Sequence, residues 1–229
     1  SMRQKLNPIT VEVIGNALAS IAEEILVGLI KSAYSTNIKE RQDCSSVVLD
    51  SHGQVVVISN MSLPMHLGSF LFTGKALLER FNKDDMHEGD VFIVNDPYSG
   101  GPSHLADVTF IAPVCNQGKV IGFVGNTGHW PDVGGKAPGQ AALGDATEIY
   151  QEGLRIPPVR LVREGEVQQD ILNMVLLNVR DSENRNGDIR AHIGSVKLGA
   201  QRFSELVDQY GSKKMTFALA ESLNASERQ

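Results

Sequence analysis

Apolar residues near the start of the chain recur at every third or fourth position, at Ile14, Leu18, Ile21, Ile25 and Leu29. This spacing places their side chains on one face of a helix. We therefore expect an amphipathic helix from residue 8 to about residue 33, which packs against the core and has no catalytic role. A shorter helical pattern occupies residues 168–179. After it, residues 189–210 show a second long apolar face of this kind. Helices are thus predicted toward both ends of the chain.

The middle of the chain has the shorter apolar runs that are typical of strands. They occupy residues 45–49, 54–58, 91–94, 108–114, 119–124 and 159–162, and one further helix is predicted at residues 69–81. Strands that are grouped between helices, without regular alternation of the two, indicate antiparallel pairing. We expect a single α+β domain over residues 1–229, with a largely antiparallel sheet flanked by the N-terminal amphipathic helix and the C-terminal helices.

Charge and cysteine content narrow the class of protein. The net charge is −6 and no run of basic residues occurs, which argues against a protein that binds nucleic-acid phosphates. The two cysteines, Cys44 and Cys115, lack C-x-x-C spacing and fit free thiols in a reducing compartment. The N-terminus has no apolar signal core and no uninterrupted apolar run reaches membrane-spanning length, so we expect a cytoplasmic protein.

The candidate chemistry lies in a glycine-rich window, because 11 of the 22 glycines fall between Gly100 and Gly153. The window holds two copies of H-x-x-D, His104 with Asp107 and His129 with Asp132, on either side of a predicted hairpin. If the hairpin brings its outer ends together, the two His-Asp pairs converge on one place. Imidazole nitrogens and carboxylate oxygens are ligands that suit a divalent metal such as Mn, Fe(II) or Zn. The alternative is that these residues only form hydrogen bonds to neighbouring loops.

Three further positions have both a functional and a structural interpretation. Asp96 ends a predicted strand ahead of two glycines, so it could form an Asx turn, act as a base, or orient a ligating histidine. His66 precedes a predicted helix and could line the site, although a structural role is the more common one for a lone histidine. The cluster around Arg41 and Asp43 is interpreted as a solvated group of charges rather than a buried pair.

Six runs of the sequence, taken in order, resemble the hydantoinase B family. They are IKERQDCS (38–45), PMHLGS (64–69), NDPYSGG (95–101), HLADV (104–108), GHWPDVGG (128–135) and EGLRIPP (152–158). That family includes the B half of ATP-dependent 5-oxoprolinase, subunits of N-methylhydantoin amidohydrolase and the alpha subunits of acetone carboxylase. The resemblance covers about residues 8–210.

The resemblance implies a two-component enzyme. A hydantoinase A-like partner uses ATP to phosphorylate the substrate, and the B component hydrolyses the activated cyclic amide or imide, in a homo- or hetero-oligomer. It implies a divalent metal (Mn, Zn or Fe) on His104, Asp107 and His129, with Asp132 as a fourth ligand or an orienting group. Asp96, Asp132 and His66 are the predicted catalytic residues. This chain has no ATP-binding motif, so ATP is expected to be used by the partner.

Two other functions stay open at this point. One is a component of an acetone-type carboxylase, and the other is a non-catalytic module that assembles with the A component. Many relatives have a second histidine where Trp130 stands, and a threonine in place of Ser103, which weakens assignment to one branch. Because family members are longer, we expect the chain to be the N-terminal portion of a longer protein that lacks activity alone.

Overall fold

The computed structural model describes residues 7–60, 70–101, 105, 107–135 and 153–227. Within these residues, seven antiparallel strands form one sheet in the order β2-β1-β5-β4-β3-β6-β7. The elements are α1 (Pro8–Ser32), α2 (Thr36–Lys39), β1 (Cys44–Asp50), β2 (Val55–Asn60), α4 (Thr73–Arg80), η2 (Lys83–Asp85), β3 (Val91–Val94), η3 (Pro97–Ser99), β4 (Asp107–Asn116), β5 (Lys119–His129), β6 (Val159–Arg163), β7 (Glu166–Val167), α7 (Gln169–Leu177), α8 (Ser182–Tyr210) and α9 (Ser212–Glu227). The predicted α+β class and the helices at both ends are confirmed.

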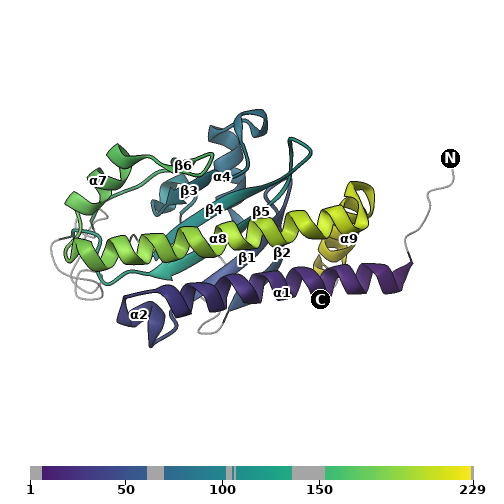
Figure 1. The fold of residues 1–229 in the computed structure, drawn as a ribbon, viewed down its shortest axis with the longest axis horizontal. Helices are drawn as coiled ribbons and strands as arrows, with labels where there is room; N and C mark the ends of the chain where they lie inside the picture. The colour runs from purple at the N-terminus through teal and green to yellow at the C-terminus, as the bar shows by residue number, and fades with distance from the viewer. Residues whose placement is uncertain (1–6, 61–69, 102–104, 106, 136–152, 228–229) are drawn as a thin grey trace.

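Two long helices, α1 and α8, lie side by side over one face of the sheet (Figure 1). The helix α1 begins at Pro8, where the side chain of Asn7 accepts a hydrogen bond from the backbone N–H of Ile9, a common N-cap arrangement. All five apolar residues that predicted α1 are buried. By length and mean hydropathy (1.7) α1 also qualifies as a candidate membrane span, but its apolar stripe packs here against α8 and the sheet.

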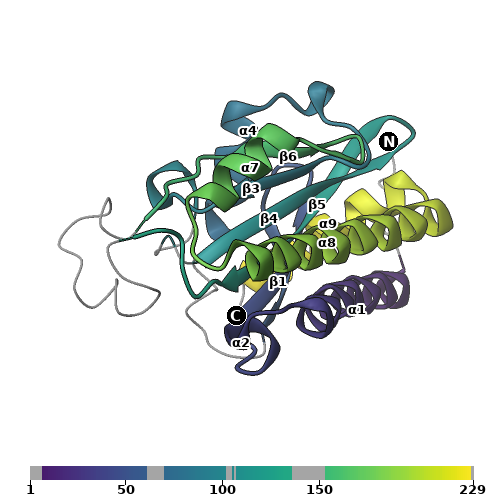
Figure 2. The ribbon, with the colours of Figure 1, turned by 60° about the vertical axis from the view of Figure 1, so that its left-hand side comes forward.

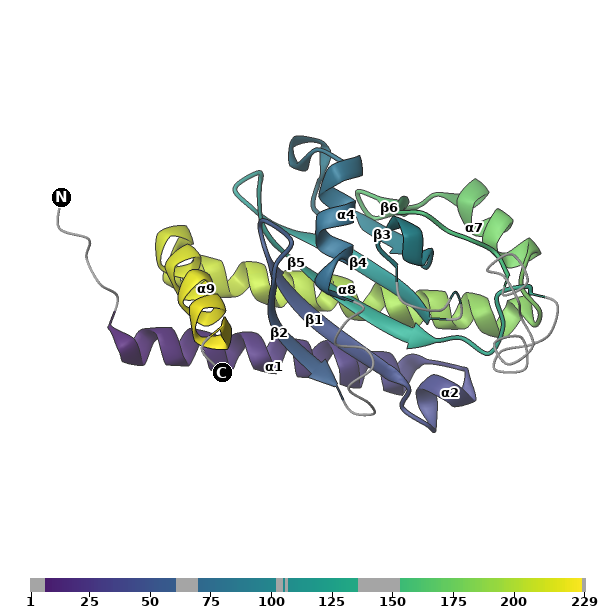
Figure 3. The ribbon, with the colours of Figure 1, turned by 180° about the vertical axis from the view of Figure 1, so that it is seen from behind.

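The opposite face of the sheet is covered by α4, so the sheet lies between two helical layers (Figure 2). The smaller core on this side contains Val47, Leu49 and Phe123 from the strands, together with Phe70 and Leu77. Seen from behind, α4 crosses the sheet while α9 crosses the N-terminal half of α1 (Figure 3). The sheet therefore has one face under α1 and α8, and an opposite face that α4 covers in part.

The hairpin of β4 and β5 determines which residues meet at the end of the sheet. Its two-residue turn, Gln117 and Gly118, has positive φ at both positions (51° and 75°), as a type I′ turn requires. The strands then pair without interruption from Val114 and Gly122 back to Asp107 and His129, which lie directly opposite each other. The predicted hairpin is confirmed, and it joins one residue from each H-x-x-D motif.

Several boundaries differ from the predicted ones. Phe70 and Leu71 are helical ahead of α4, which runs from Thr73 to Arg80, while residue 69 lies outside the described residues. The helix α8 begins at Ser182 rather than 188, where the left-handed residue Asp181 (φ 53°) reverses the chain. The strand β5 continues to His129 rather than ending at residue 124. A Cβ on Gly128, inside β5, would lie 2.9 Å from the ring of His192, so glycine there admits close packing of α8.

Candidate functional site

The site is built around His129, the last residue of β5. Its Nδ1 lies 2.7 Å from Oδ1 of Asp107, the first residue of β4, and both side chains are buried. A carboxylate only accepts hydrogen bonds, so Nδ1 carries the hydrogen and the neutral ring keeps its lone pair on Nε2. Nε2 is buried and has no hydrogen-bond partner among the described residues. One polar atom of the pair is therefore available to a ligand.

The charge of the His129 ring is set by opposing effects. Burial disfavours the imidazolium, but the hydrogen bond and negative charge of Asp107, together with the charge of Asp43, outweigh burial and the opposing charge of Arg41. The net result is a raised pKa for His129. A carboxylate that orients an imidazole in this way also makes Nε2 a better base or metal ligand.

Asp43 lies beside this pair, a placement that sequence reasoning missed. The backbone N–H of His129 donates a hydrogen bond to the carbonyl of Asp43 (3.1 Å). Asp43 is half-buried, whereas Arg41 is exposed, so the predicted solvated cluster describes only part of this segment. The informative signal is the pairing of β1 with β5, which no local pattern in residues 38–45 reveals.

Three hydroxyl side chains form the next row of the sheet on the same face. Ser45, Thr127 and Thr109 lie opposite one another on β1, β5 and β4. The hydroxyls of Thr109 and Thr127 are 2.6 Å apart. The Ser45 hydroxyl is fully buried and has no partner among the described residues.

Asp96 lies just beyond β3 and is held by Arg155. The guanidinium donates from Nε to Oδ1 and from Nη2 to Oδ2, each at 3.1 Å, and Ser99 donates a third bond at 2.7 Å. Burial favours the neutral acid, but these bonds and the charge of Arg155 outweigh it, so the pKa of Asp96 is lowered. Its carboxylate is already engaged, and its role as a base stays a prediction.

Next to Asp96, the side chain of Asn95 ties three segments together. Its amide N–H groups donate to the carbonyls of Leu105 and Leu154, and its Oδ1 accepts from the N–H of Ile156. These bonds join the end of β3 to the chain just before β4 and to the segment that contains Arg155. The NDPYSGG and EGLRIPP runs, far apart in sequence, are thus fixed side by side.

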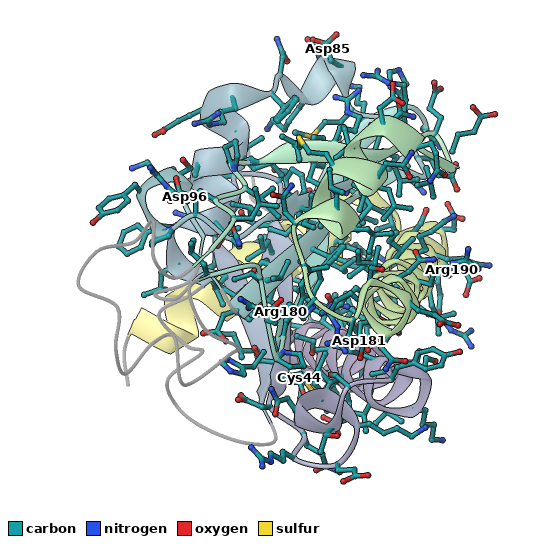
Figure 4. All side chains as sticks on the ribbon, turned by 90° about the vertical axis from the view of Figure 1, so that its left-hand side faces the viewer. Cys44, Asp85, Asp96, Arg180, Asp181 and Arg190 are labelled. Atoms are coloured by element: carbon teal, nitrogen blue, oxygen red, sulfur yellow. The ribbon has the colours of Figure 1, made fainter. Side chains whose placement is uncertain are left out.

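Asp132 is bound to the segment between α7 and α8. Its carboxylate accepts from the side chain and from the backbone N–H of Arg180, and Arg180 also donates to the carbonyl of Gly135. Asp132 and Asp107 therefore have different partners, and a ligand role for Asp132 stays a prediction. In Figure 4, which looks onto this end of the molecule, Arg180 lies by the start of α8 and Asp96 beside the blue segment that contains β3.

The face under α8 holds a different histidine. Trp130 Nε1 donates to His192 Nε2 (3.1 Å), and His192 Nδ1 donates to Asn126 Oδ1 (2.7 Å). The tautomer follows from the indole, which can only donate. The ring stacks on Phe110 at 4.3 Å, and burial lowers its pKa to about 3. Trp130 thus has a structural partner.

Two predicted site residues, His66 and His104, lie outside the described residues. Among the described residues, no group of three or more His, Cys, Asp or Glu side chains is gathered closely enough to hold a metal. Of the six predicted site residues, the structure brings together His129 and Asp107, and it ties Asp96 and Asp132 to separate arginines.

Comparison with known proteins identifies the family of this chain. The family profile described as Hydantoinase B/oxoprolinase matches residues 7–229. The chain belongs to the hydantoinase B/oxoprolinase family. Caprolactamase subunit beta of Pseudomonas jessenii is 33% identical over 97% of this chain, and the 5-oxoprolinase of Dictyostelium discoideum is 32% identical over 90%. The matches cover 38% and 16% of those two proteins, so this hydantoinase B chain spans well under half of either.

Two solved structures share the fold. The crystal structure of ATP-dependent caprolactamase from Pseudomonas jessenii matches 98% of this chain and 38% of its own, with a TM-score of 0.88 and 32% identity. An acetone carboxylase, in its nucleotide-free structure, matches 95% of this chain and 28% of its own, with a TM-score of 0.84 and 21% identity. The second likeness concerns the fold alone, whereas the first extends to sequence.

Proposed function

We propose that this hydantoinase B chain belongs to the B-type component of an ATP-dependent hydrolase that opens a cyclic amide or imide. The observation that carries the proposal is the buried pair of Asp107 and His129, whose Nε2 has no partner among the described residues. The ATP-dependent caprolactamase that shares this fold at 32% identity supports a lactam or imide as substrate. ATP is used by an A-type partner, which phosphorylates the substrate, in a cytoplasmic oligomer.

A divalent metal fits the described part of this site. Histidines that bind metals commonly donate their second ring N–H to a carboxylate, as His129 does to Asp107. Mn, Zn or Fe would be held by His129 Nε2 and by His104, which precedes Asp107 by three residues, while Asp107 would orient the His129 ring through its bond to Nδ1. When bound, such a metal polarises a carbonyl or lowers the pKa of a water molecule.

The chain's own residues have separable tasks in this proposal. Asp107 holds the His129 ring in one tautomer and orientation, and Nε2 faces the ligand as an acceptor. Asp96 positions Arg155, and Asp132 positions Arg180, so two cations are held near the loops that the NDPYSGG and GHWPDVGG runs begin. These cations suit the anionic phosphate of an activated substrate. His66 remains a candidate that lines the same site.

The two alternatives have weaker support. The carboxylase function rests on a structural likeness at 21% identity, which concerns the fold. If the chain served only for assembly, we would expect every polar atom at this end of the sheet to have a hydrogen-bond partner. Nε2 of His129 has none among the described residues. Hydrolysis of an activated amide therefore has the better support.

The test is reconstitution with an A-type partner, ATP, and either ε-caprolactam or 5-oxoproline. We expect ATP-dependent ring opening by the wild type, bound metal in the purified protein, and loss of both in His104→Ala and His129→Ala. Ring opening that persists in both variants would favour the assembly function. Ketone consumption that depends on bicarbonate would favour the carboxylase, and turnover by metal-free protein would exclude the metal.

A further inference from the structure

Two buried polar atoms on the same face of the sheet lack partners among the described residues, and they lie on adjacent strands. Nε2 of His129 is one, and the hydroxyl of Ser45 is the other. Ser45 pairs with Thr127, two residues before His129 on β5. Side chains two residues apart on a strand share a face, and diagonal neighbours across antiparallel strands have Cα atoms roughly 7–8 Å apart. The two side chains are therefore near neighbours on this face of the sheet.

We propose that Ser45 is a ligand-binding residue of the hydantoinase B site, whose hydroxyl donates a hydrogen bond to the activated amide group of the substrate. This inference rests on the proposed amide hydrolysis. A serine hydroxyl has one donor hydrogen, and that hydrogen has no acceptor among the described residues. The adjacent Thr109 and Thr127 share a single hydrogen bond, so the hydroxyl that accepts it has its own hydrogen to direct elsewhere.

The chemistry of the two rows is complementary to an amide. The hydroxyl row supplies donors, while Nε2 of neutral His129 supplies an acceptor or a metal ligand. An activated amide or imide under attack has an oxygen or ring nitrogen that gains negative charge and, next to it, a water that must lose a proton. Preorganised donors aimed at such an oxygen are a large source of catalysis, and losing one costs roughly 10²–10³ in kcat.

A purely structural role for Ser45 leads to a different expectation. Buried hydroxyls are normally satisfied within the fold, as the next residue illustrates. Ser46 points to the other face and donates to the carbonyl of Ala22 in α1 at 2.5 Å. Ser45 and Ser46 are both fully buried in β1, so they form a matched pair that differs in whether the fold supplies a partner.

The first experiment compares the melting temperatures of the 229-residue chain and of two variants, Ser45→Ala and Ser46→Ala. Removing a hydroxyl that the fold does not satisfy leaves stability unchanged or improves it, so Ser45→Ala should keep its Tm or raise it by up to about 4 °C. Ser46→Ala should lower Tm by about 2–4 °C, because the Ala22 carbonyl loses its donor. A Tm for Ser45→Ala that falls as far as that of Ser46→Ala overturns the proposal.

The second experiment measures ring opening of ε-caprolactam by the complex reconstituted with its A-type partner and ATP. We expect Ser45→Ala to lower kcat by about 10²–10³ and Ser46→Ala to retain wild-type kcat below its melting temperature. Equal kcat values for Ser45→Ala and the wild type overturn the role of Ser45. If the wild type opens neither this ring nor 5-oxoproline, the proposed function fails, and Ser45 is judged by the melting comparison alone.

Discussion

Two buried histidines lie on opposite sides of the same sheet and differ in almost every physical respect. His192, under α8, has a partner for each ring nitrogen, stacks on Phe110 and has its pKa lowered by burial. His129, on the α4 side, is bonded to a carboxylate, has a raised pKa and keeps one nitrogen without a partner among the described residues. The first is complete within the fold, and the second is not.

The difference gives a criterion for separating structural from functional polar groups. A buried polar atom without a partner costs roughly 1–3 kcal/mol, so a fold that keeps one has a reason outside its own packing. The criterion assigns His192 to stability and His129 to ligand binding. The sequence singles out His129 through its H-x-x-D motif, but it does not show which ring nitrogens of the two histidines have partners.

The largest expected effect comes from removing each ring in turn. His192→Ala leaves the N–H of Trp130 and the Oδ1 of Asn126 without partners and opens a cavity against Phe110. We expect a loss of about 3–5 kcal/mol in the free energy of unfolding, measured by urea denaturation. His129→Ala should lose less, about 1–3 kcal/mol, since it takes the donor from the buried Asp107 carboxylate but also removes an atom without a partner among the described residues.

Activity should rank the two variants in the opposite order. In the reconstituted complex at 15 °C, where both remain folded, His129→Ala should lower kcat by at least about 10³, and His192→Ala by less than about tenfold. The division into a structural and a functional histidine is contradicted if folded His192→Ala loses as much activity as His129→Ala. It is also contradicted if His129→Ala is the less stable of the two variants.

The second prediction uses the lowered pKa of His192. The folded state binds a proton on this ring only near pH 3, whereas the unfolded chain binds one below about pH 6.5. As the pH falls below 6.5, the unfolded state takes up a proton that the folded state refuses. Stability from this residue is therefore complete above pH 6.5 and declines by about 1.4 kcal/mol per pH unit below it.

The matching control is His192→Gln, which removes the titrating ring. Urea denaturation at pH 7, 6 and 5 should give a steeper decline for the wild type than for the variant, whatever their absolute stabilities. Parallel declines would show that His192 is protonated in the folded protein, and the criterion based on complete partners would then lose its clearest example.

The sequence predicts most of the fold and part of the site. The period of Ile14 to Leu29 determines α1, and the turn at Gln117 and Gly118 determines the hairpin that joins Asp107 to His129. The position of Asp43 beside His129 depends on β1 pairing with β5 across about 80 residues of chain, which no local pattern encodes. The partners of Asp96 and Asp132 lie 59 and 48 residues away in the sequence, so the sequence predicts roles for these carboxylates without revealing their arginines.

The third and smallest expected effect applies the same criterion to Asp96. Arg155 and Ser99 supply three bonds to its carboxylate, so the criterion makes it a positioning group, whereas the sequence predicts a catalytic residue. Asp96→Asn and Arg155→Gln break the same pair, in which Arg155 is 31% exposed, and each should cost about 1 kcal/mol in stability.

Kinetics of the same two variants separate the roles of Asp96. If Asp96 acts through Arg155, both variants should raise KM for the activated substrate by a similar factor and leave the dependence of kcat on pH unchanged. If Asp96 is itself the base, Asp96→Asn alone should lower kcat by about 10²–10⁴ and remove the acidic limb of the pH profile. That result would show that complete hydrogen bonding in the free protein does not exclude a catalytic role, and the criterion drawn from the two histidines would hold for imidazoles but not for carboxylates.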